Sequence, residues 1–326
     1  MSSLEDLFSK RLIVVMGKGG VGRTSIAAAL ATSLSRMGRR TLLYQASAKE
    51  KLSQLLGGPR VGEQLEEVRE NLWAVNTNPG AALHEYGLMI LRYETIYRMV
   101  FENRVTKSLL RAIPGLDDYS IIGKMWWHAT QEEEDGSLRW DTVVFDAPAT
   151  GHALTMFKIP SAILEAVPDG PLTRDAVRVR RLLEDPDQTS VVLVTLAEEM
   201  PTNEAIELHD RLHTDLHMHP ACLVVNQLYP DRFTAHTGPA RVLSALLSGG
   251  EEVARDSVLS QVLPAARTIY LRRELNERYL ARAREKIKLP EVHVPLLLVP
   301  SLGNEEVDAI ARIIEEQTVP MARRMA

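Results

Sequence analysis

Glycine, cationic and hydroxyl residues are concentrated in the segment Gly17-Lys-Gly-Gly-Val-Gly-Arg-Thr-Ser25. Glycines allow backbone N–H groups to converge on phosphate oxygens, and a helix that starts where such a loop ends adds partial positive charge. The spacing predicts a phosphate loop in which the Thr24 hydroxyl is a ligand of Mg²⁺. A glycine-rich turn that binds nothing is the alternative. The predicted phosphate-binding residues are Gly17, Gly19, Gly20, Val21, Gly22, Arg23, Thr24 and Ser25.

A second chemical feature is the acid that ends the segment Trp140-Asp-Thr-Val-Val-Phe-Asp146. A carboxylate at the end of a buried strand can hold Mg²⁺ through the water shell of the ion. We therefore predict that Asp146 and Thr24 share one magnesium site. The alternative role for Asp146 is to cap the turn that follows the strand.

The elements that must position these groups alternate along the chain as short apolar runs and longer helical stretches. This order predicts a doubly wound, mainly parallel α/β sheet. The near-continuous Val, Leu and Ile content is typical of strands buried on both faces. We expect a single domain over residues 1–326 with a helical insertion at about 80–135. The predicted strands are Leu12–Met16, Thr41–Tyr44, Leu72–Val75, Thr142–Phe145, Ser190–Thr195, Cys222–Asn226 and Val294–Val299.

Several motifs resemble one family of ATP-dependent proteins. Lys18, early in the phosphate loop, resembles the signature lysine of the deviant Walker A class, and other segments resemble the ArsA-like ATPases within that class. These segments are Ile113-Pro-Gly-Leu-Asp117, Asp146-Ala-Pro-Ala-Thr-Gly-His152, Thr195-Leu-Ala-Glu-Glu-Met-Pro-Thr-Asn-Glu204 and Val224-Val-Asn-Gln-Leu228.

The resemblance implies a MinD/ArsA-like P-loop NTPase fold with ATP or ADP and Mg²⁺ as cofactors. It implies a dimer in which Lys18 reaches the phosphates held by the partner. It also implies that Asn226 contacts adenine and that the loop ending at Pro300 closes over the base. For Asn226 the alternative is a turn-capping asparagine.

Two positions depart from the pattern of an active ATPase of this family. Arg23 occupies the position where a phosphate loop normally has lysine. Ser47 occupies the position where the family has the aspartate that orients or deprotonates the attacking water. A serine is no base at neutral pH. We therefore expect nucleotide binding with weak or lost hydrolysis, in a homodimer or as the regulatory half of a heterodimer with an intact ArsA-like paralogue. Gln45 could still orient water, as glutamine does in Ras-like GTPases.

Two other functions stay open at this point. One is an active ATPase that drives delivery or positioning of a protein client. The other is a non-catalytic interaction protein in which nucleotide binding has been lost.

Composition excludes several other classes. The charge of 38 cations against 43 acids argues against a nucleic-acid surface, because phosphate backbones require clustered Lys and Arg. No apolar run approaches the roughly 20 residues of a membrane span, so we expect no stable membrane insertion. The acidic N-terminal segment does not resemble a secretory signal, which favours a cytoplasmic location. Within one chain, the lone Cys222 can form neither the paired-cysteine zinc site nor the arsenite-binding cysteine triad of the family.

The helical insertion carries aromatic and methionine residues at helical spacing. Such a stripe could line a groove for a protein client, as in the targeting members of the family, or pack the insertion onto the sheet. The residues concerned are Tyr86, Met89, Ile90, Tyr93, Tyr97 and Phe101, followed by Ile121, Ile122, Met125, Trp126 and Trp127.

Overall fold

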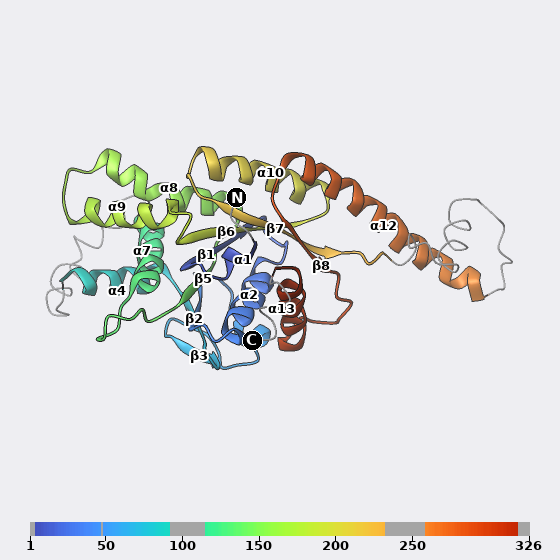
Figure 1. Ribbon diagram of the computed structural model, residues 1–326, viewed down its shortest axis with the longest axis horizontal. Helices are drawn as coiled ribbons and strands as arrows, with labels where there is room; N and C mark the ends of the chain where they lie inside the picture. Colours follow the sequence, from blue (N-terminus) through green and yellow to red (C-terminus); the bar gives the residue numbers. More distant parts are fainter. Residues whose placement is uncertain (1–3, 47, 92–114, 232–257, 319–326) are drawn as a thin grey trace.

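An eight-stranded sheet runs through the centre of the computed structural model, which describes residues 4–46, 48–91, 115–231 and 258–318 (Figure 1). Its strand order is β3-β4-β2-β5-β1-β6-β7-β8, and every pair is parallel except β3 with β4. This confirms the predicted doubly wound, mainly parallel α/β fold. The strands are β1 Leu12–Gly17, β2 Thr41–Ala46, β3 Glu66–Arg69, β4 Leu72–Thr77, β5 Thr142–Asp146, β6 Thr189–Leu196, β7 Pro220–Leu228 and β8 Glu291–Pro295.

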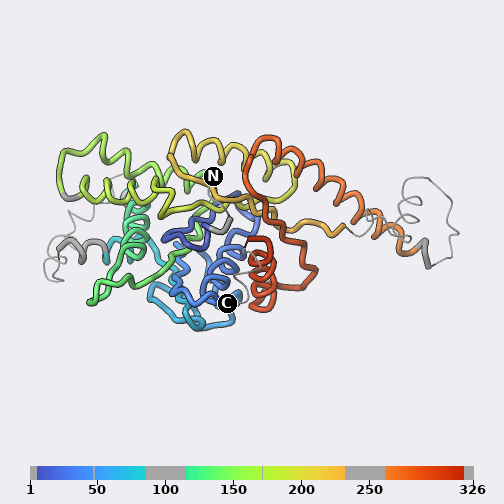
Figure 2. Tube along the Cα trace, viewed as in Figure 1, coloured from blue at the N-terminus to red at the C-terminus, as the bar shows by residue number. Residues whose placement is uncertain are grey.

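Helices cover both faces of the sheet and complete three layers (Figures 1 and 2). One face is packed by α1 Leu4–Leu7, α2 Arg23–Arg36, α3 Leu52–Leu56 and α13 Asn304–Thr318. The other face carries α4 Pro79–Leu91, α7 Leu116–Thr130, α8 Thr150–Ala166, α9 Pro171–Glu184, α10 Glu199–Thr214 and α12 Val258–Lys286. None of the helices in these described ranges is long and apolar enough to cross a bilayer.

The alternation of side chains along β1 explains why both faces are covered. Leu12, Val14 and Met16 point into the core beneath α7, α8 and α10, whereas Ile13 and Val15 point into the core beneath α2 and α13. All five are fully buried. Successive residues of a strand face opposite sides, so a continuous apolar run requires an apolar layer on each side.

The structure corrects the predicted strand at Val294–Val299. Strand β8 instead covers Glu291–Pro295, and the apolar run Leu296–Val299 leaves the sheet as a loop. Strand β8 is an edge strand in which half-buried and buried residues alternate. Its first residues include the polar Glu291 and His293, so the apolar run did not mark where the strand begins. Strand β3 was not predicted, because its sequence Glu-Glu-Val-Arg is charged and lies at the other, antiparallel edge.

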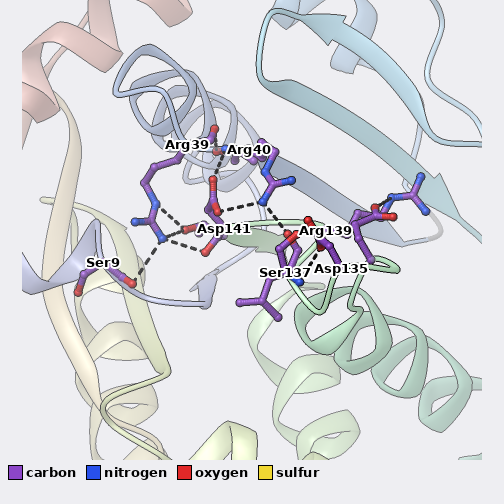
Figure 3. A network of polar contacts seen from close by, with 11 residues as sticks. Ser9, Arg39, Arg40, Asp135, Ser137, Arg139 and Asp141 are labelled. Atoms are coloured by element: carbon purple, nitrogen blue, oxygen red, sulfur yellow. Dashed lines mark hydrogen bonds and ion pairs between the residues drawn. The ribbon is translucent and has the colours of Figure 1, made fainter.

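An arginine network ties together the ends of the strands opposite the phosphate loop (Figure 3). Arg39 donates to the Asp141 carbonyl and to the Thr142 hydroxyl, both at 2.8 Å. The Arg40 backbone N–H donates to the Asp141 carboxylate at 2.7 Å. Arg11, just before β1, donates to the Ala129 carbonyl in the last turn of α7. The Thr142 hydroxyl in turn donates to the Lys10 carbonyl at 2.7 Å, so these bonds join the starts of β1, β2 and β5 to each other and to α7.

Helices α4 and α7 account for the described part of the predicted insertion. Ile121, Ile122 and Met125 of α7 are buried against the sheet, whereas Trp126 and Trp127 are half-buried. The buried Lys124 links the two helices through an ion pair with Glu85 at 2.8 Å. Tyr86, Met89 and Ile90 lie on α4. Tyr93, Tyr97 and Phe101 of the predicted stripe lie outside the described residues.

Candidate functional site

The phosphate loop lies at the carboxyl ends of the central strands. It connects β1 to α2, and β1 is flanked by β5 on one side and β6 on the other. From β1 the chain proceeds to β2 on one side, and from β5 it later crosses to β6 on the other side. Ligands of open α/β sheets bind at such a reversal of strand order. The fold therefore places the predicted site where a nucleotide would be expected.

Two of the loop glycines cannot be replaced without a clash. An added Cβ at Gly22 would lie 2.3 Å from Nδ2 of Asn226, and Gly22 also has a φ of 91°. An added Cβ at Gly17 would lie 2.2 Å from the Val194 carbonyl oxygen. Gly20 has a φ of 90°, in the left-handed region that favours glycine. Gly17 and Gly22 therefore let the loop pack closely against β6 and β7, and Gly20, which is exposed, allows the turn in which backbone N–H groups can face a phosphate.

The loop lines a cavity of about 450 Å³ together with residues from other elements. An adjoining cavity of about 180 Å³ shares Gly22, Ser25, Gln227 and Leu302 with it and is otherwise mostly apolar. One polar and one apolar compartment match the two ends of a nucleotide. Gln227 belongs to the motif that ends β7, and Leu296, Leu297 and Val299 belong to the loop ending at Pro300 that the family resemblance placed over the base. The sequence carried no signal for the lining residues Lys51, Gln54, Leu55, Leu302 and Ile310.

Asp146 lies at the centre of the polar contacts near the loop. One of its carboxylate oxygens, Oδ2, accepts hydrogen bonds from the Thr24 hydroxyl at 2.7 Å and from Gln45 Nε2 at 2.6 Å. Burial raises the pKa of Asp146, whereas these two hydrogen bonds and the positive charge of Arg23 lower it. Thr24 and Asp146 thus present a hydroxyl and a carboxylate side by side. Hard oxygen ligands of this kind fit Mg²⁺.

Arg23 is turned back onto its own chain. Its Nη1 donates to the carbonyl oxygen of Ala147, the residue after Asp146. Burial lowers the pKa of Arg23, and the neighbouring Asp146 carboxylate opposes that shift. One part of the guanidinium group therefore already has a backbone partner, which holds the group toward Ala147, while its other N–H groups remain available as donors.

Lys18 forms an ion pair with Glu204 on α10 of the same chain. Both side chains keep about a third of their surface exposed, at 30% and 34%. Glu204 closes the segment that begins at Thr195, so two of the motifs identified in the sequence meet at this contact. The lysine lies at the edge of the site and remains accessible to a ligand or a partner.

Asn226 supports the loop from the end of β7. Its Nδ2 donates to the Val21 carbonyl at 2.9 Å, and its Oδ1 accepts from the backbone N–H of Gln227 at 2.9 Å. Asn226 also lines the apolar cavity. Pro300 is exposed and lies beyond Val299, which lines that cavity, and Ser47 lies outside the described residues.

Cys222 is buried in β7, and burial raises the pKa of its thiol to about 12. Within the described ranges, no three His, Cys, Asp or Glu side chains are arranged to hold a metal ion. A magnesium ion at Thr24 and Asp146 would therefore take its remaining ligands from water and from the nucleotide.

The fold and site define a P-loop nucleotide-binding protein. The chain matches the family model of the anion-transporting ATPases over residues 10–168 and 172–242, and it belongs to this ArsA-like ATPase family. Members of the family act on nucleotide with Mg²⁺.

Individual relatives agree with this assignment. The chain is 28% identical over 310 residues to the ATPase BagA of Mycobacterium tuberculosis, covering 90% of this chain and 88% of that protein. It is 25% identical over 263 residues to the ATPase GET3 of Kluyveromyces lactis, covering 70% and 75%. It is 24% identical over 269 residues to an arsenical pump-driving ATPase of Acidiphilium multivorum, covering 75% and 45%.

Proposed function

We propose that this ArsA-like ATPase binds ATP and ADP with Mg²⁺ as a nucleotide-dependent dimer and hydrolyses ATP weakly or not at all. The observation that carries the proposal is the contact of Arg23 with the Ala147 carbonyl. A guanidinium is planar and longer than the lysine ammonium usual at this position. It can bind phosphate, but it places its charge differently from the point charge that the reaction requires.

The residue type at position 47 supports the same conclusion. Ser47 cannot take a proton from water at neutral pH, and loss of such a base commonly reduces the rate by about 10²–10⁴, or roughly 3–5 kcal/mol of barrier. Binding does not depend on that group. The glycine cradle, the two adjoining cavities and the pair formed by Thr24 and Asp146 all remain available to a nucleotide.

Lys18 supports a role toward a second chain. Lys18 is present at the position of the signature lysine, whereas Arg23 and Ser47 replace two residues that an active site of the family would have. In a heterodimer with an intact paralogue, Lys18 would act on the site of the partner, and this chain would serve as the regulatory half. In a homodimer the same exchange would hold two nucleotides without fast turnover.

An active ATPase that delivers or positions a protein client is the second candidate. It is favoured by the intact contact between Thr24 and Asp146, which active P-loop enzymes need for magnesium. The Kluyveromyces relative is named an ATPase without reference to arsenic. Arsenite pumping is disfavoured because the chain has one cysteine and it is buried.

Turnover of ATP by the purified chain with Mg²⁺ separates these candidates. We expect little or no phosphate release from the wild type, and a gain in the double variant Arg23→Lys with Ser47→Asp. The Arg23→Ala variant is the control, because any phosphate release that it retains comes from contaminating ATPases. Substantial wild-type turnover that disappears in Arg23→Ala would establish an active enzyme instead.

Nucleotide binding is measured separately, from the stability of the chain with and without ligand. A nucleotide at 100 times its Kd should add about 2.7 kcal/mol to the free energy of unfolding. No such increase would show that nucleotide binding has been lost.

A further inference from the structure

Gln45 occupies an unusual position beside the proposed magnesium site. It lies near the end of β2, in register with Asp146 of β5, and its side chain is buried. Its Nε2 donates to Oδ2 of Asp146 at 2.6 Å. The Thr24 hydroxyl donates to the same oxygen at 2.7 Å. The amide therefore helps to fix the orientation of the carboxylate.

The other end of the same amide is unsatisfied. Gln45 Oε1 is buried and accepts no hydrogen bond from any described residue. An amide oxygen that is buried without a donor is costly, so a partner is expected in the working state. A phosphate oxygen cannot be that partner, because it is itself an acceptor. A water molecule bound to Mg²⁺ can be, because it has two hydrogens to donate.

We propose that Gln45 is a positioning residue for the magnesium ion. Its amide nitrogen holds Asp146, and its amide oxygen accepts a hydrogen bond from a water of the metal's shell. The inference rests on the proposed function and deepens it. It differs from the hypothesis that Gln45 orients the attacking water, because the water involved belongs to the metal's shell and is present when ADP is bound, without any turnover. Outer-shell partners of this kind commonly change metal affinity about 10–100-fold.

The test uses Mn²⁺ as a paramagnetic substitute for Mg²⁺ and ADP as the nucleotide, so that no turnover is needed. Binding of Mn²⁺ to the full chain with ADP is followed by electron paramagnetic resonance, and binding of ADP alone is measured in EDTA. The variant is Gln45→Met, which keeps the length of the side chain and removes both amide groups. Gln131→Met is the matched control, since Gln131 also has a buried amide oxygen without a partner but lies at the end of α7.

We expect Gln45→Met to weaken Mn²⁺ binding at least about tenfold, with ADP binding in EDTA unchanged and with Gln131→Met behaving as wild type. Unchanged Mn²⁺ affinity would overturn the inference. Equal losses of Mn²⁺ and ADP affinity would also overturn it, because Gln45 would then only shape the pocket. If Gln45→Met does not fold, Gln45→Ser gives the same decision. A wild type that binds no ADP in EDTA would instead reject the proposed function itself.

Discussion

At the scale of single residues, Gly22 determines whether the phosphate loop can lie against the end of β7. Its backbone has a positive φ, and its missing side chain leaves room for Nδ2 of Asn226. Asn226 in turn donates to the Val21 carbonyl one residue earlier in the loop. Gly22 and Asn226 thus pack the phosphate loop against the end of β7, although the two residues are far apart in the sequence.

We predict that Gly22→Ala destabilises the chain by about 1–3 kcal/mol, through strain at the left-handed φ and displacement of Asn226. Urea unfolding without nucleotide measures this change. Gly19→Ala is the control for stability, because nothing lies within 4 Å of its added Cβ and its φ is not positive. Equal stability of the two variants would contradict this account of the loop.

At the scale of elements, α7 meets the sheet through a histidine that is buried in the neutral form. Both ring nitrogens of His128 lack a hydrogen-bond partner among the described residues, and its ring centroid lies 5.8 Å from that of Tyr44. Burial lowers the pKa of His128 to about 3, and the positive charges of Lys124 and Arg139 act in the same direction.

This depressed pKa predicts a pH dependence of stability. Between pH 6.5 and 3 the unfolded chain binds a proton that the folded chain does not, so the free energy of unfolding falls as the pH falls. The loss should reach about 2 kcal/mol at pH 5. We expect His128→Phe, which can keep the contact with Tyr44, to lack this loss in urea unfolding at pH 7.5 and pH 5. Parallel curves for the two proteins would refute the prediction.

Sequence patterns predicted elements better than their edges. Buried strands such as β1 and β5 are apolar on both faces and are identified without ambiguity. The run Pro295–Val299 looks equally apolar, yet most of it lines the cavity beside Asn226. Local composition cannot distinguish a strand buried in a sheet from a loop that lines a cavity, because both are apolar in sequence, although Leu298 and Val299 of this loop are 75% and 39% exposed.

The candidate site shows the same limit. The spacing of the loop predicted a set of phosphate-binding residues and a magnesium site shared by Thr24 and Asp146, and in the structure these two side chains are hydrogen-bonded to each other. It did not predict that Gln45 would hold Asp146, or that Arg23 and Lys18 would contact Ala147 and Glu204. Those contacts depend on which strands become neighbours, and a motif read along one segment does not contain that information.

At the scale of the whole molecule, the proposed dimer requires the Lys18 side chain to break its ion pair with Glu204 and to reach the partner's site. Glu204 competes with the partner for this lysine, and a partly exposed pair of this kind contributes about 1 kcal/mol at most. We predict that Glu204→Gln favours the dimer by up to roughly fivefold for each released lysine. Sedimentation in Mg-ATP measures the monomer–dimer equilibrium.

Glu207→Gln provides the comparison, since Glu207 lies on the same helix and pairs with Arg211 instead. It should dimerise as the wild type does. If Glu204→Gln also matches the wild type, the ion pair does not restrain Lys18. Loss of the dimer in Lys18→Ala would still show that the lysine itself is needed.

The positions of the tryptophans give the chain an internal optical reporter. All four, Trp73, Trp126, Trp127 and Trp140, lie on α7 or on and beside β4 and β5, and none of them lines the two cavities. Trp73 and Trp140 are in contact, with ring centroids 5.1 Å apart. Intrinsic fluorescence therefore cannot respond to a nucleotide by direct contact. Any change in tryptophan emission when ADP is added would report a change around α7, β4 or β5, dimerisation included, which makes the unlabelled protein its own sensor of events away from the two cavities.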